Sequence, residues 1–348
     1  MKSSSLEFIL NQRNFIKSRK GELVIDTDTH ITHPQLIGAE TKDKLNTYKG
    51  YFQGMPICAE QLINEMDLNG VDMALIWQNP ACIDYGKNQL VNYQKLLEAN
   101  EYIYTSSRKY PTRFIAAGWT DPKALGVDLA KKCAEKLILD YGFPIVKMNP
   151  AQNGFYMDSP MVFEVLDTIT GLNAVPAFHV GSDTEYTSVK ALEKIATTYP
   201  DSPIIAVHMG GGGAGYNEAE GNYHAIRNLG LKFDNLKFPL SAKRDTHIES
   251  DLISFKLAGH QFYRNLFYAS DAPYGKISWN VGGFKSLLKN LQSNDYLADT
   301  RLQEHPGLFD LTSEQQIMGG NFADFICEVY SNLLAVYGHT ETGHQKII

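Results

Sequence analysis

Asp28 and His30 are the first residues in the chain whose types and spacing could do chemistry. They end the stretch LVIDTDTH, which begins with an apolar run. Residues two apart in a β-strand point to the same face, so the carboxylate and the imidazole start roughly 6.6 Å apart along the backbone and can both reach one metal ion. An isolated D-x-H is more often a strand end with a turn-forming Asp and a surface His. The rest of the chain must therefore supply further ligands.

Further polar residues stand at the ends of other apolar runs, namely Lys147, His179, His208 and Asp271. With Asp28 and His30 they make a mixed set of nitrogen and oxygen donors suited to Zn²⁺, Mn²⁺ or Fe²⁺. A single His after a strand is more often a hydrogen-bonded core residue than a ligand. The metal-site hypothesis therefore depends on a fold that brings all these strand ends together.

Apolar runs alternate with segments of helical periodicity along the chain. Strands are expected at 23–30, 71–77, 114–119, 144–148, 174–181, 203–208, 231–234 or 236–240, and 265–271. Helices are expected at 59–70, 88–108, 122–141, 159–172 and 184–199. Eight strands alternating with helices over about 250 residues predict an α/β protein with a (β/α)8 TIM barrel, in which all strand ends meet at one mouth. A doubly wound open sheet is the alternative, but the first turn lacks the nucleotide fingerprint that it would need.

The composition of the 348 residues is that of an ordinary globular enzyme, with 43% hydrophobic and 20% charged residues. We expect an N-terminal arm at 1–21, one barrel at 22–337 and a polar tail at 338–348. The net charge of −7 argues against a nucleic-acid partner. Without a long apolar segment neither a secretory signal nor a membrane span is supported, and a cytoplasmic protein is expected. The 4 scattered cysteines contain no C-x-x-C pair, which fits reduced thiols.

The order of these motifs resembles the amidohydrolase-related family of metal-dependent barrels, which includes aminocarboxymuconate-semialdehyde decarboxylase and resorcylate-type decarboxylases. The matching stretches lie between residues 22 and 330 and read IDTDTH, EMDLNGVDMAL, KMNPAQNGFYMDSP, AFHVG, AVHMGGGG, FYASDAPYG and IMGGNFADF. The resemblance implies that His30, His179 and Asp271 bind the metal and that Asp28 stands at the position of another ligand. It also implies a catalytic role for His208. The usual first-strand motif is H-x-H, and Asp28 replaces its first His, as an acidic residue does in some decarboxylases.

Two reactions fit this machinery. The first is hydrolysis of a small polar, carboxylated substrate by a metal-activated water, with Asp271 as the base and His208 hydrogen-bonding the oxyanion. The alternative is non-oxidative decarboxylation, with Asp271 or His208 delivering a proton to carbon. One divalent ion is expected, zinc first and manganese or iron next. A second metal on a carbamylated Lys147 is less favoured, because Asp28 breaks the usual first-strand pair.

Five residues are weaker candidates for contact with the substrate: Lys147, Trp77, Trp119, His33 and Arg244. Lys147 could pair with a substrate carboxylate, the two tryptophans end the second and third strands, and the other two fall in loops. A small-molecule substrate is the only partner that the residues imply directly, and a homodimer through the arm or the helix at 88–108 is compatible with them. A barrel that has lost catalysis is the contrasting class, and the intact set of imidazoles and Asp271 argues against it.

Overall fold

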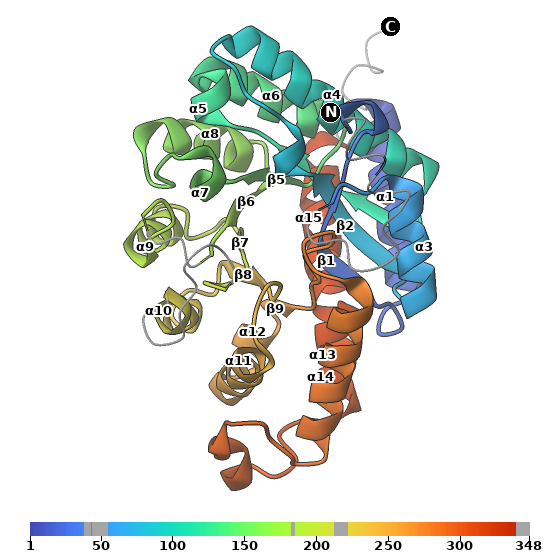
Figure 1. Ribbon diagram of the computed structural model, residues 1–348, viewed down its shortest axis with the longest axis vertical. Helices are drawn as coiled ribbons and strands as arrows, with labels where there is room; N and C mark the ends of the chain where they lie inside the picture. The colour runs from blue at the N-terminus through green and yellow to red at the C-terminus, as the bar shows by residue number, and fades with distance from the viewer. Residues whose placement is uncertain (38–42, 44–54, 182–184, 212–221, 339–348) are drawn as a thin grey trace, which may run out of the picture.

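The computed structural model describes residues 1–37, 43, 55–181, 185–211 and 222–338, and parallel strands surrounded by helices form its centre (Figure 1). The expected (β/α)8 barrel is confirmed. Its strands are β1 (Ile25–Ile31), β2 (Met73–Gln78), β3 (Phe114–Ala116), β4 (Gly118–Trp119), β5 (Ile145–Met148), β6 (Val175–His179), β7 (Ile204–Val207), β8 (Leu236–Pro239) and β9 (Leu266–Phe267).

Every strand pair is parallel, in the order β1-β2-β3 followed by β4 to β9. The third expected strand is divided into β3 and β4 at Ala117, whose N–H donates to Ile76 at 2.9 Å. The ring closes where the Thr27 N–H donates to the Tyr268 carbonyl at 3.2 Å and where Thr29 bridges to Ala272. The carboxyl ends of the strands therefore face one mouth, as the barrel geometry requires.

The strands are buried on both faces, because the barrel interior covers one face and the helices cover the other. Every residue of β1, β2 and β5 is buried. In β1 this burial includes two aspartates, two threonines and a histidine. Buried polar groups need partners, so the sequence of β1 already demands a polar network inside the mouth of the barrel.

The helices that cover the barrel are α1 (Ser3–Ser18), α3 (Ala59–Asn69), α4 (Gln89–Lys109), α5 (Pro122–Leu125), α6 (Val127–Leu139), α7 (Pro150–Asn153), α8 (Pro160–Gly171), α9 (Val189–Thr198), α10 (Asn222–Gly230), α11 (Asp245–Ala258), α12 (His260–Tyr263), α13 (Ile277–Gln292), α14 (Leu311–Gln315) and α15 (Asn321–Tyr337). Short helical turns lie at η1 (Pro34–Leu36), η2 (Pro80–Cys82), η3 (Thr300–Glu304) and η4 (Gln316–Gly320). The helices expected at 59–70, 88–108 and 159–172 match α3, α4 and α8 closely.

Two expected helices differ from the structure. The helix expected at 122–141 is interrupted at Gly126, which has a φ of +78°. L side chains rarely adopt this left-handed backbone conformation, so the corner favours a glycine. The helix expected at 184–199 begins only at Val189, after Ser188 accepts a hydrogen bond from the Ala191 N–H.

The seventh strand had two alternatives in the sequence. The alternative at 236–240 is confirmed, because β8 pairs with β7 through Ile204 and Leu236. The alternative at 231–234 is wrong, since this segment forms the turn that follows α10. The two segments have similar apolar content in the sequence. Only the segment at 236–240 pairs with β7, and this pairing makes it the strand.

The segment before residue 21 forms helix α1, which packs against α15. Ile9 and Ile16 are both 1% exposed, and the Gln12 amide donates to the Pro111 and Phe114 carbonyls at 2.7 and 2.8 Å. Hydrophobic burial and buried hydrogen bonds therefore join α1 to the helical layer. The predicted tail lies outside the described residues except for Gly338. None of the described helices combines the length and the apolar run needed to cross a membrane.

Candidate metal centre

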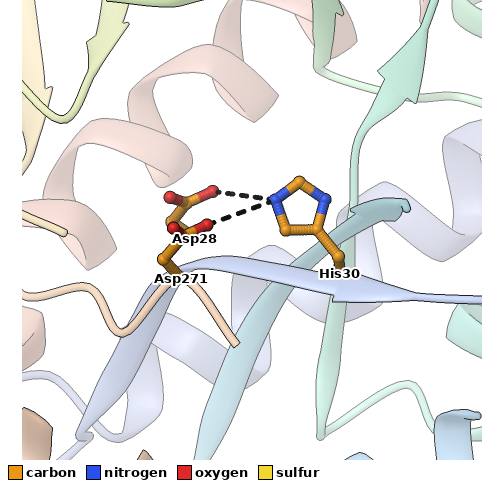
Figure 2. Close-up of side chains that lie close together, drawn as sticks. All are labelled: Asp28, His30 and Asp271. Carbon is orange, nitrogen blue, oxygen red and sulfur yellow. Dashed lines mark ion pairs between the residues drawn. The ribbon is translucent and has the colours of Figure 1, made fainter. Parts of the chain in front are cut away.

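Asp28, His30 and Asp271 converge at the mouth of the barrel (Figure 2). One donor atom from each lies within 4.8 Å of the other two. The Nε2 atom of His30 is 3.7 Å from Asp28 Oδ1 and 3.6 Å from Asp271 Oδ1. Ligands about 2.1 Å from a shared ion stand roughly 3 to 3.5 Å from each other. The two separations from His30 are close to this range, so the three side chains form a candidate site for one divalent ion.

His30 is oriented by its second ring nitrogen. Its Nδ1 atom lies 2.9 Å from the Gln78 carbonyl oxygen at the end of β2. A carbonyl can only accept, so Nδ1 carries the proton and the lone pair of Nε2 faces the two carboxylates. The register between β1 and β2 shifts between Asp26 and Thr29, and such an irregularity redirects the side chains that follow it. Local strand geometry thus aims Asp28 and His30 at the same point.

Asp271 does not lie in the last strand, because β9 ends at Phe267. It stands in a turn with a φ of 60°, in the left-handed region that non-glycine residues rarely adopt. The turn is held by a hydrogen bond from the Gly275 N–H to the Asp271 carbonyl at 2.8 Å and by one from the His30 N–H to the Ala272 carbonyl at 2.6 Å. Strained residues of this kind often cluster at functional sites. Backbone pairing with β1 therefore places the Asp271 carboxylate beside His30.

Asp28 is fully buried and both its oxygens accept hydrogen bonds. Oδ1 accepts from Trp77 Nε1 at 3.1 Å and from Lys147 Nζ at 3.3 Å, and Oδ2 accepts from Ser241 Oγ at 2.7 Å. Burial works to raise the pKa of Asp28, but the positive charge of Lys147, followed by the nearby imidazoles, outweighs it and holds the pKa well below its usual range. Asp28 is therefore ionised and can bind a metal cation.

Lys147 is 1% exposed and lies between two tryptophans. Its Nζ atom is 3.7 Å from a ring centroid of Trp77 and 5.4 Å from one of Trp119, distances at which an ammonium gains cation–π stabilisation. Burial lowers the pKa of Lys147, while Asp28 acts in the opposite direction. The lysine is thus a buried partner of Asp28 that also lines the cavity at the mouth.

His208 follows β7 and has a φ of 72°. Its Nδ1 atom lies 2.8 Å from Ser241 Oγ. Burial lowers the pKa of His208 to about 4, although Asp271 opposes the shift, so the ring is neutral near pH 7. His179 ends β6, and its ring packs edge-on against that of His208 with centroids 4.8 Å apart. His179 lies outside the three-residue group but lines the same cavity, and its role as a further ligand stays a prediction.

The cavity in front of these residues has a volume of about 200 Å³. That is below the roughly 300 to 1,000 Å³ of pockets for drug-sized ligands, so it suits a small molecule. Besides the predicted residues it is lined by Pro80, Asn149, Gln152, Ala242 and Tyr274. Sequence reasoning did not assign these five. The available signal was their position in the sequence, because Asn149 directly follows β5 and Tyr274 lies in the loop after β9.

Four predicted substrate residues lie elsewhere. Trp77 and Trp119 are 0% and 1% exposed and pack behind the site. His33 accepts a hydrogen bond from the Gln35 N–H, and its ring packs against Tyr102. Arg244 is exposed at the start of α11. Among the described residues, none of these four lines the cavity that holds Asp271 and His208.

The family model described as amidohydrolase matches residues 25–299, so the chain belongs to the amidohydrolase family. It is an enzyme of that superfamily, a hydrolase or a carboxy-lyase. A comparison with curated proteins gives no match.

Three similar solved structures are decarboxylases. The chain is 13% identical to a dihydroxybenzoic acid decarboxylase from a Polaromonas species with bound manganese and the inhibitor 2-nitroresorcinol, over 88% of this chain and 97% of that chain, with a TM-score of 0.60. A manganese-bound 5-carboxyvanillate decarboxylase from Novosphingobium aromaticivorans is 14% identical over 88% of this chain and 97% of that chain, with a TM-score of 0.60. A 2,6-dihydroxybenzoate decarboxylase from Rhizobium is 14% identical over 76% of this chain and 92% of that chain, with a TM-score of 0.57. At these identities the similarity shows the barrel fold.

Proposed function

We propose that this protein is a metal-dependent, non-oxidative decarboxylase of a small carboxylic acid that carries a neighbouring hydroxyl group. The observation that carries the proposal is the convergence of Asp28, His30 and Asp271 beside a small cavity, which His30, Asp271 and the ammonium of Lys147 line. The similar structures support decarboxylation, because they are decarboxylases of hydroxylated aromatic acids.

The charge balance of the site favours an anionic substrate. Metal ligands must be deprotonated, so Asp28 and Asp271 each carry a negative charge, and Lys147 returns one positive charge. A divalent ion would leave the site with a net positive charge. A substrate carboxylate would therefore be attracted to the cavity, and the buried setting strengthens that attraction.

Manganese is the first metal that we propose. The three donors are two carboxylates and one imidazole, and carboxylate oxygens suit Mn²⁺ while imidazole also suits Zn²⁺ and Fe²⁺. Two of the similar decarboxylases are described with bound manganese. We therefore place manganese ahead of zinc, which the sequence alone favoured.

We propose a single metal ion. Lys147 would have to become a negatively charged carbamate to bridge two ions. Its Nζ atom lies 3.3 Å from Asp28 Oδ1 and 3.7 Å from a ring centroid of Trp77, and both neighbours stabilise a cation and oppose an anion. The surroundings of Lys147 thus favour the ammonium form.

In the proposed reaction the bond between the substrate carbon and its carboxylate breaks, CO₂ leaves, and a proton takes its place on carbon. A bound divalent ion would withdraw charge from the substrate oxygens and stabilise the electron pair left on carbon. Lys147 would orient the anionic substrate. Asp271 and His208 face the same cavity, so either can exchange a proton with the substrate. No electron acceptor is needed.

Hydrolysis is the second candidate, because the matching family model is that of amidohydrolases. In this reaction Asp271 or His208 would take a proton from the attacking water and return it to the leaving group. The two candidates use the same residues and differ in the bond that breaks.

The test is to remove metal with a chelator, reload the protein with Mn²⁺ or Zn²⁺, and screen hydroxybenzoates for CO₂ release and esters and lactones for hydrolysis. The proposal predicts CO₂ release that depends on the metal and is lost in Asp271→Asn. Asp295→Asn, at an exposed position, is the matched control and should keep the activity. Ester or lactone hydrolysis without CO₂ release would replace the proposal by the second candidate, and a protein that binds no divalent metal would overturn both.

A further inference from the structure

Ser241 lies between Asp28 and His208 and contacts both. It stands two residues after the end of β8, and it is 0% exposed. Its Oγ atom is 2.7 Å from Asp28 Oδ2 and 2.8 Å from His208 Nδ1. The direct distance from His208 Nδ1 to Asp28 Oδ2 is 3.8 Å, so the hydroxyl is the link between the imidazole and the carboxylate.

The proton count of this chain fixes the direction of each bond. A serine hydroxyl has one hydrogen, and an ionised carboxylate can only accept. The Ser241 hydrogen must therefore point to Asp28, since otherwise two oxygens without a hydrogen between them would stand 2.7 Å apart. The Ser241 oxygen can then only accept from His208. His208 must carry its proton on Nδ1, and its Nε2 atom is left with a lone pair.

The backbone around His208 is held by the same segment that carries Ser241. The His208 N–H donates to the Pro239 carbonyl at 3.0 Å, and Lys243 Nζ donates to the Met209 carbonyl at 3.2 Å. Lys243 is itself fixed by a fully buried ion pair with Asp251 at 2.9 Å. His208 is thus held in a left-handed conformation, with its ring directed to Ser241 on one side and to the cavity on the other.

We propose that Ser241 is a positioning residue that fixes His208 in the Nδ1–H tautomer, so that Nε2 meets the substrate as a proton acceptor. The use of Nε2 in turnover rests on the proposed function, whereas the tautomer itself does not.

The tautomer limits what His208 can do. A neutral His208 with its proton on Nδ1 cannot donate from Nε2 to an oxyanion. It can accept the proton of a substrate hydroxyl, and the ring then becomes an imidazolium whose charge faces Asp28 through Ser241. The same proton can return to the product when CO₂ has left. The hydroxyl therefore couples the charge of Asp28 to the basicity of a histidine that does not touch it directly.

The test measures the tautomer directly by nitrogen NMR of protein labelled at histidine, both free of metal and loaded with diamagnetic Zn²⁺. His208→Asn identifies the signals of His208 among the 10 histidines. In the wild-type protein we expect a protonated Nδ1 and an unprotonated Nε2. Ser241→Ala should shift His208 to a mixture that includes Nε2–H, and Ser241→Thr, which keeps a hydroxyl, should restore the wild-type pattern.

Ser5→Ala is the matched control. Ser5 is also 0% exposed, donates to the Asp140 carbonyl at 2.7 Å and accepts from Arg108 at 3.2 Å, but it lies on α1. Its replacement should leave the His208 signals unchanged. On a substrate found by the screen above, Ser241→Ala should lower kcat by about 10- to 100-fold with little change in KM, and Ser241→Thr should recover most of it.

Two results would overturn the inference: a wild-type His208 protonated on Nε2, or an Ser241→Ala protein that keeps the pure Nδ1–H form. Neither measurement requires turnover. If no substrate is found, the tautomer still decides the role of Ser241, so failure of the proposed function is told apart from failure of this inference.

Discussion

Asp28 and Asp121 are two buried aspartates at the same mouth of the barrel, and their surroundings differ in charge. Both are 0% exposed; Asp28 lies within β1, and Asp121 stands two residues after the end of β4. Asp28 receives hydrogen bonds from the Lys147 ammonium and from two neutral side chains. Asp121 receives them from the N–H groups of Lys123 and Ala124 at 2.9 and 2.8 Å, where it caps helix α5.

The two carboxylates respond in opposite directions. Burial raises the pKa of both, but at Asp28 the charge of Lys147 reverses the effect. At Asp121 burial prevails over the backbone and Asn153 hydrogen bonds, and the pKa rises to about 6. Burial at the mouth of the barrel therefore does not by itself make an aspartate a ligand. The ammonium of Lys147 keeps Asp28 ionised. Asp121 instead accepts hydrogen bonds from backbone N–H groups and an amide, and it caps a helix.

The largest expected effect is that of Asp28→Asn. It removes one proposed ligand and leaves Lys147 buried without an anion, so the metal-free protein should lose about 3 to 5 kcal/mol of unfolding free energy. Affinity for Mn²⁺ should fall by more than the roughly 10- to 100-fold typical of residues behind the ligands. Urea unfolding and calorimetric Mn²⁺ titration measure the two effects. Unchanged Mn²⁺ affinity would remove Asp28 from the metal site.

Lys147→Met should cost about 3 kcal/mol without metal, because Asp28 keeps only its bonds from Trp77 and Ser241. Mn²⁺ should restore more stability than it adds to the wild-type protein, since the ion replaces the missing positive charge and binds more tightly. Thermal unfolding with chelator and with Mn²⁺ compares the two states.

Lys243→Met is the control for that experiment. It breaks the buried pair with Asp251, which lies outside the three-residue metal group. We expect a similar loss of stability that Mn²⁺ does not reverse. If Mn²⁺ rescued both lysine variants equally, the special relation between Lys147 and the metal would be refuted.

Asp121→Asn tests the contribution of the Asp121 carboxylate to the pH dependence of the unfolding free energy. The native pKa of about 6 is above the unfolded value near 3.8, so the native state binds more protons between these values. The contribution of Asp121 is therefore intact below about pH 4 and is lost as the pH rises to about 6, by up to roughly 3 kcal/mol. Asn still caps a helix. The variant should show a flatter stability profile over this range and bind Mn²⁺ like the wild type; an unchanged slope would contradict the assignment.

The smallest expected effect is that of Trp77→Phe, which keeps an aromatic ring near Lys147 but removes the hydrogen bond to Asp28. A bond to a charged group contributes about 1.5 kcal/mol or more, and Mn²⁺ affinity should change only a few-fold. Trp119→Phe is the matched control, because Trp119 Nε1 is buried and has no hydrogen-bond partner among the described residues. Its replacement should cost only the packing loss that both tryptophan variants share, so the extra loss in Trp77→Phe measures the hydrogen bond. An equal loss in both variants would show that packing alone is being measured.

The sequence determined the barrel and most of the site. Alternation of apolar strands and helices predicts the order of the elements. The strand ends of a closed parallel barrel must meet, so the sequence predicts that Asp28, His30 and Asp271 lie together. The family resemblance is confirmed by the match over residues 25–299. These inferences succeed because they depend on local periodicity and on a single topological rule.

Only the tertiary structure determines the protonation state and the hydrogen-bond partners of the side chains at the mouth of the barrel. Ser241 stands 213 positions from Asp28, and Lys147 stands 119 positions from it, yet both bond to its carboxylate. No periodicity connects such positions, and an apolar run ending in Asp reads alike at Asp28 and at Asp121. Charge in a buried site depends on distances of a few ångströms between distant segments, so the sequence names the groups at the mouth and the folded barrel sets their charge and direction.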